Sequence, residues 1–111
     1  MSRRSNPALP ELAPVFLALG DKTRLRLIAV LCVGGAFSTT QLTANTQITR
    51  QAVTKHLRVL AEAGLVKDLK VGRERVWQYD PTQLEAARRS LEIIGRQWEH
   101  ALSKLKAFVE D

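Results

Sequence analysis

Apolar residues recur at intervals of three and four positions along much of the chain, which is the spacing of one face of an α-helix. This pattern predicts a short first helix within Leu9–Leu19, after a flexible polar tail over residues 1–8. A second helix is predicted over Lys22–Val33, because Asp21 can cap its first turn and the glycine pair at 34–35 can end it. The side of this helix predicted to face the core carries Leu25, Ile28, Ala29 and Cys32.

Two further helices, joined by a tight turn, are predicted in the middle of the chain. Ser38 and Gln41 have the spacing of a capping box, in which each side chain binds a free backbone amide at a helix start. A short helix ending near Asn45 is therefore expected. After a break, Thr49 can cap a fourth helix that runs to about Ala63.

The apolar pattern changes from helical spacing to that of strands after Gly64, a residue that can end the fourth helix in a left-handed conformation. The sequence LVKDLKV over residues 65–71 and RVWQY over residues 75–79 predict two β-strands. Gly72–Glu74 lie between them as a turn. A basic two-stranded hairpin is therefore expected directly after the fourth helix.

A long final helix is predicted from Pro81 to about Val109, since Asp80 and Gln83 can cap its first turn. Apolar positions then alternate at spacings of three and four over several heptads. Such a seam needs a partner helix, either in the same chain or in a second subunit. We expect both, with self-association dominant. The predicted dimer-interface residues are Leu84, Ala87, Leu91, Ile94, Trp98, Ala101, Leu105 and Phe108.

The helix predicted over Thr49–Ala63 has an apolar stripe of Val53, Leu57 and Leu60 and an opposite face rich in groups that read DNA. Arg can bond guanine, Gln can bond adenine, Thr can bond bases or phosphate, and Lys follows phosphate. A solvated polar face is the commoner explanation for one such helix, but the basic hairpin beside it favours DNA binding. The predicted DNA-binding residues are Thr49, Arg50, Gln51, Thr54, Lys55, His56 and Arg58 on the helix, and Lys67, Lys70, Arg73 and Arg75 on the hairpin.

Charge and composition agree with this interpretation. The 111 residues, 45% of them hydrophobic, are enough for one domain with a real core, expected over residues 9–111. The 17 Lys and Arg residues exceed the 11 Asp and Glu residues, which gives a net charge of +6 and attracts polyanions. Seven basic and three acidic residues lie between Arg50 and Arg75, whereas the segment from Asp80 onward has five basic and six acidic residues. The basic surplus is therefore concentrated where DNA contacts are predicted.

Cysteine and motif usage exclude several other classes of protein. Cys32 is the only cysteine, so an intrachain disulfide and a Cys-rich zinc site are excluded, and a reducing cytoplasm is expected. Its place on the apolar side of the second helix predicts an inert core residue. No membrane span, cofactor or enzyme motif is recognised, so neither a membrane partner nor catalysis is expected.

The run ITRQAVTKHLRVLAEAGLV, followed by VGRERVWQYDP, resembles the recognition helix and wing of ArsR/SmtB-type winged-helix repressors. The run ALGDKTRLRLIAVL resembles their first core helices, so the resemblance spans roughly residues 14–110. It implies a mostly α-helical winged helix-turn-helix fold with about five helices and a two-stranded wing. It also implies a homodimer, built from the first and last helices, that represses transcription at an imperfect inverted repeat. By position, the helix residues that would face DNA are Arg50, Gln51, Thr54, Lys55 and Arg58. The wing would be formed by Gly72, Arg73 and Arg75, and His56 would have a structural or phosphate-contact role.

The chain departs from the metal-sensing members of that family. The metal-sensing members share one of two kinds of site. One is a Cys-x-Cys site on the third helix, and the other is a set of carboxylate and His ligands on the last helix. Residues 38–45 contain no Cys or His, and His100 lacks converging ligands beside it. No metal site is therefore expected, although one shared across a dimer stays open.

Two questions stay open from the sequence. The signal could be a small molecule, a partner protein or simple competition for the operator, and the residues do not rank these. The alternative function is a protein-interaction module that uses the C-terminal helix and does not bind specific DNA.

Overall fold

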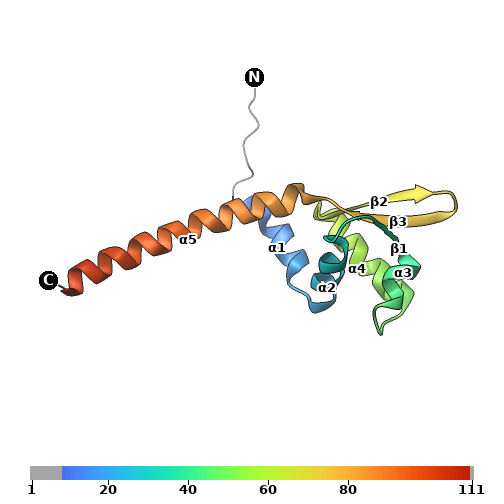
Figure 1. Cartoon of the computed structure of the whole chain (residues 1–111), viewed down its shortest axis with the longest axis horizontal. Coiled ribbons are helices and arrows are strands. Elements are labelled where there is room, and N and C mark those ends of the chain that lie inside the picture. The colour runs from blue at the N-terminus through green and yellow to red at the C-terminus, as the bar shows by residue number, and fades with distance from the viewer. Residues whose placement is uncertain (1–8, 111) are drawn as a thin grey trace, which may run out of the picture.

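The computed structural model describes residues 9–110, so the predicted tail over residues 1–8 lies outside the described part. The fold is the expected mostly α-helical winged helix-turn-helix arrangement (Figure 1). In chain order the elements are η1 (Leu9–Leu12), α1 (Ala13–Leu19), α2 (Lys22–Leu31), β1 (Ala36–Ser38), α3 (Thr39–Ala44), α4 (Arg50–Glu62), β2 (Val66–Val71), β3 (Glu74–Tyr79) and α5 (Pro81–Glu110).

The sheet has three antiparallel strands in the order β1-β3-β2, whereas the sequence predicted two. The predicted hairpin is confirmed, with Lys70 opposite Arg75 in the register of β2 and β3. The additional strand is β1, which places Phe37 opposite Trp77. This strand has only three residues and pairs with a strand far along the chain, so no local pattern indicates it. Its pairing anchors the base of the wing to the segment that leads into α3.

The buried side of α2 differs from the prediction. Leu27, Ile28 and Leu31 are buried, whereas Leu25, Ala29 and Cys32 are exposed. The helix contains apolar residues on more than one side, and packing against α1 and α4 selects the Leu27–Leu31 side. The prediction that Cys32 is an inert core residue is therefore wrong, because α2 ends at Leu31 and the thiol-bearing residue faces solvent.

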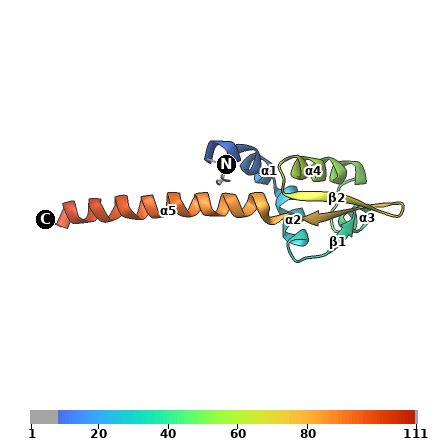
Figure 2. The same cartoon turned by 90° about the horizontal axis from the view of Figure 1, so that it is seen from above.

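The hydrophobic core lies between the helices and the sheet. The predicted stripe of α4 is confirmed, since Val53, Leu57 and Leu60 are fully buried. Helix α5 enters this core only near its start, where Ala86 and Ala87 are buried. The next turns of α5 border η1 and α1, and past them the helix extends away from the helical body as a single rod (Figures 1 and 2). The molecule is accordingly elongated, with extents of 67 × 43 × 21 Å.

A buried hydrogen bond joins the wing to the helix-turn-helix. Trp77 Nε1 on β3 donates to Thr39 Oγ1 at the start of α3 at 2.9 Å, and both residues are buried. Thr39→Val keeps the side-chain shape but leaves the indole N–H without an acceptor. We expect a loss of about 1–3 kcal/mol in the free energy of unfolding, measured by urea denaturation. Thr39→Ser, which keeps the hydroxyl, should lose less. Equal stability of Thr39→Val and the unchanged chain would contradict this role.

Gly64 ends α4 in the left-handed conformation that the sequence predicts, with φ of +79°. A Cβ at this position would lie 2.8 Å from Gln83 Cγ on α5, so Gly64→Ala combines backbone strain with a close contact. We expect a loss of about 1–2 kcal/mol, seen as a lower Tm. Gly95→Ala is the matched control, because a Cβ there meets nothing within 4 Å and the residue is helical, so its Tm should rise slightly. A Gly64→Ala variant as stable as the control would refute this explanation.

Candidate nucleic-acid interface

The helix-turn-helix is built by the side-chain caps that the sequence predicts. The Ser38 backbone N–H donates to Gln41 Oε1 at 2.8 Å, and the Gln41 N–H donates to Ser38 Oγ at 3.0 Å. Thr49 Oγ1 accepts from the Ala52 N–H at 3.1 Å and begins α4. In the turn between the helices, Thr46 Oγ1 donates to the Thr43 carbonyl at 2.9 Å. These bonds fix the point at which α4 leaves the turn and therefore the direction of its first residues.

The first two turns of α4 carry the predicted DNA-binding side chains on one surface. Arg50, Gln51 and Lys55 are exposed and Thr54 is half-buried, and these four line one shallow surface depression. Arg58, one turn further along, is also exposed. The only acidic residue of α4 lies at its C-terminal end, so this surface has no negative side chain from its own helix. We call these residues, with Thr49, the α4 surface.

The wing brings a second group of predicted residues to an edge of the molecule. The β2–β3 hairpin extends beyond the helices, with its turn at Gly72 (Figures 1 and 2). Its four basic residues are all exposed, but one of them is paired with an acidic side chain. Arg75 Nε lies 3.4 Å from Asp68 Oδ2, which neutralises part of its charge. Among the described residues no acidic side chain pairs with Lys70 or Arg73. The exposed basic residues of the wing are Lys67, Lys70, Arg73 and Arg75.

His56 is also on α4, but its side chain contacts residues of α2 and its N-cap rather than lying on the α4 surface. Its Nδ1 lies 3.1 Å from Arg24 Nη1 and 3.8 Å from Asp21 Oδ2, both on the side of α2. The hydrogen bond from the Arg24 backbone N–H lowers the pKa of Asp21, and the nearby His56 acts in the same direction. The structure therefore gives His56 the structural contacts that the sequence offered as one of two roles. The sequence missed Arg24, because 32 residues separate it from His56 and no local pattern connects them.

The predicted dimer residues fall into two groups. Ala87 is buried in the core of its own chain, and half-buried Leu84 packs against that core. The other residues of the seam are exposed, including Trp98 at 63% and Phe108 at 80% of the residue surface. The exposed residues of the predicted seam are Leu91, Ile94, Trp98, Ala101, Leu105 and Phe108.

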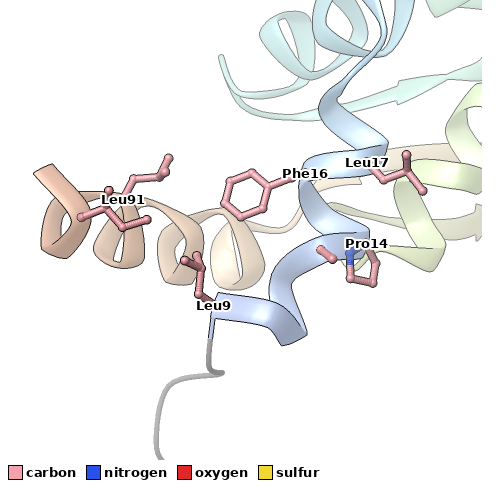
Figure 3. A pocket seen from close by; sticks show the side chains of 7 residues that line it. Leu9, Pro14, Phe16, Leu17 and Leu91 are labelled. Atoms are coloured by element: carbon pink, nitrogen blue, oxygen red, sulfur yellow. The ribbon is translucent and has the colours of Figure 1, made fainter.

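An apolar groove continues this seam onto the N-terminal helices. It has a volume of about 840 Å³ and lies between η1 and α1 on one side and α5 on the other. Figure 3 shows Phe16 of α1 pointing toward the α5 side, where Leu91 lies. Leu17 is 76% exposed at the rim. Two elements, α1 and α5, therefore present one continuous apolar surface. The groove is lined by Leu9, Ala13, Pro14, Phe16, Leu17, Leu91 and Ile94.

Within residues 9–110, no three His, Cys, Asp or Glu side chains come together as a metal site would require. No helix in that same range is both long and apolar enough to cross a membrane.

Comparison with known proteins gives consistent matches. A family described as "Helix-turn-helix domain" matches residues 19–68. The "HTH-type transcriptional regulator Rv2034" of Mycobacterium tuberculosis is 41% identical over 86 residues, which cover 78% of this chain and 77% of that protein. The structure of an "ArsR-like Transcriptional Regulator from Rhodococcus sp. RHA1" is 38% identical, with a TM-score of 0.76, and the match covers 89% of this chain and 92% of that one. The "transcriptional repressor BigR from Xylella fastidiosa" is 25% identical, with a TM-score of 0.60 and coverage of 76% and 83%.

Proposed function

This chain belongs to the ArsR family of winged helix-turn-helix transcriptional regulators, and we propose that it is a homodimeric repressor that binds an inverted-repeat operator in double-stranded DNA. The observation that carries the proposal is the α4 surface. It combines guanidinium, amide and hydroxyl groups on the first turns of a helix that follows a tight turn. Such a helix can enter the major groove with its N-terminal half.

The wing supports the same orientation on DNA. Phosphate contacts fix register and supply affinity, whereas contacts to base edges supply sequence preference. Lys70 and Arg73 near the wing tip are suited to phosphates or the minor groove beside α4, because no described acidic side chain neutralises them. Arg50 and Gln51 are suited to base edges because both can make paired hydrogen bonds.

A second copy of the chain is the proposed occupant of the apolar surface of α1 and α5. The exposed part of α5 continues for several turns beyond its own core and carries apolar residues in a heptad-like seam. The groove beside Phe16 adds apolar area to this seam. A symmetric pair would present two α4 surfaces to successive major grooves, about 34 Å apart, which requires a pseudo-palindromic site.

Repression follows from occupancy of such a site near a promoter, and the repressor name of the Xylella fastidiosa protein agrees with it. The proposed place of action is the cytoplasm.

The proposal is tested by gel-shift titration against the DNA upstream of the chain's own coding sequence, with a scrambled duplex of equal composition as control. We expect tight binding to the first duplex and weaker binding to the second, with both affinities falling as salt rises. Transcription from that promoter should fall when the protein is added to purified polymerase. A folded dimer that binds neither duplex would refute the proposal and favour the protein-interaction module.

A further inference from the structure

Arg24 joins three helices through its side chain. Its Nε donates to the Ala18 carbonyl at 2.6 Å and its Nη2 reaches the Leu17 carbonyl at 3.4 Å, both at the C-terminal end of α1. Its Nη1 lies 3.1 Å from His56 Nδ1 on α4. A guanidinium has five N–H donors in a fixed plane, so one side chain can hold two elements at a defined angle.

The donor and acceptor roles in this contact are fixed by chemistry. The guanidinium of Arg24 can only donate, so His56 Nδ1 is the acceptor in this hydrogen bond. Asp21 Oδ2 is 3.8 Å from the same nitrogen and accepts the Arg24 backbone N–H at 3.0 Å, which places the carboxylate at the N-terminal cap of α2. We call Asp21, Arg24 and His56 the α2–α4 cluster.

Apolar contacts and hydrogen bonds constrain the rotation of α4 in different ways. Val53, Leu57 and Leu60 hold the helix through apolar burial, which has little directional preference. The hydrogen bond between Arg24 and His56 is directional, and His56 follows Lys55 of the α4 surface directly. A small rotation of α4 would move Gln51 and Arg50 relative to the base edges while leaving a basic surface in place.

We infer that Arg24 and His56 are positioning residues for operator recognition, which hold α4 at the rotation needed to read bases. The inference rests on the proposed function, because it concerns the same DNA surface. It assigns to these two half-buried residues an effect on sequence preference without a contact to DNA. Loss of their hydrogen bond should weaken operator binding and leave charge-driven binding to other DNA unchanged.

The test uses the full chain and two duplexes, one selected by the unchanged protein from a random library and one a scrambled version of it. Binding to each is measured by fluorescence anisotropy over a series of salt concentrations. His56→Leu removes the acceptor, and we expect operator affinity to fall about tenfold, which corresponds to about 1.4 kcal/mol. Affinity for the scrambled duplex and the slope of log K against log salt should stay unchanged, because no phosphate contact is lost.

Rescue separates positioning from a general structural role. His56→Asn puts an amide oxygen near the place of Nδ1, so it should recover most of the operator affinity, whereas a role in bulk packing predicts no such recovery. His100→Leu makes the same change at the exposed histidine of α5, and it should leave the affinity for both duplexes unchanged. Arg24→Lys provides an independent variant that keeps the positive charge but loses the planar guanidinium. It should reproduce the loss of operator affinity seen in His56→Leu. The double variant Arg24→Lys/His56→Leu should lose less operator affinity than the sum of the two single losses, because both changes remove the same Arg24–His56 hydrogen bond.

The outcomes distinguish this inference from the proposed function. If the unchanged protein selects no sequence, the proposed function fails, and the inference fails with it. If it selects an operator but His56→Leu and Arg24→Lys bind that operator normally, only the inference fails. An equal loss on both duplexes, or no recovery in His56→Asn, also overturns it.

Discussion

Replacing Leu91 or Trp98 by glutamate is expected to convert the proposed dimer into monomers. Both side chains are more than half exposed in the single chain, at 52% and 63%, so the change does not disturb the core of the protomer. Leu91 also lines the apolar groove beside Phe16 (Figure 3). In a dimer these positions would place a carboxylate in an apolar interface, which costs several kcal/mol unless it is paired.

The same variants should bind DNA much more weakly. Two linked α4 surfaces on one inverted repeat gain about 10²–10⁴ in affinity over a single one, and a monomer loses this gain. Light scattering coupled to size exclusion measures the mass, and a gel shift measures the affinity. Gln97→Glu, which adds the same charge beside Trp98 but off the seam, should stay dimeric and bind normally. If Leu91→Glu and Trp98→Glu both remain dimers, the proposed interface is wrong.

The sequence predicts well those features of the fold that depend on residues close together in the chain. The caps at Ser38 and Thr49 and the left-handed stop at Gly64 involve contacts within three or four residues, and each is present as expected. The apolar stripe of α4 is also clear, since its other side is almost entirely polar. The helix-turn-helix and the basic character of its exposed surface therefore follow from local patterns.

The features that the sequence does not predict depend on residues far apart in the chain. Strand β1 forms only because β3 is available beside it, and three residues carry no strand pattern of their own. The buried side of α2 is ambiguous because apolar residues surround much of the helix, so the neighbouring helices decide that Leu31 is buried and Cys32 exposed. The contact of Arg24 with His56 joins two helices with no shared pattern. For the same reason, the length of α5 that packs within its own chain could not be separated from the length left for a partner.

The roles proposed for the α4 surface and the wing predict different losses on mutation. Gln51→Ala should remove a paired hydrogen bond to a base, and discrimination between the operator and a duplex changed at that base should fall by about 1–3 kcal/mol, which is roughly five- to 150-fold. Binding to scrambled DNA should hardly change. Lys70→Ala on the wing should instead weaken binding to all duplexes and reduce the salt slope by about one. The two residues are both exposed, so neither change should disturb the fold.

The decisive comparison is the pattern across sequences and salt rather than the size of either loss. Operators with each base pair changed in turn are titrated against the unchanged chain and both variants at several salt concentrations. Under the proposed geometry, Gln51→Ala becomes indifferent to one base pair in each half-site, at symmetric positions because the dimer presents α4 twice. Lys70→Ala keeps the full pattern of preferences at lower affinity. A uniform loss in Gln51→Ala would instead make it a phosphate contact, and α4 would then have to lie across the backbone rather than in the groove.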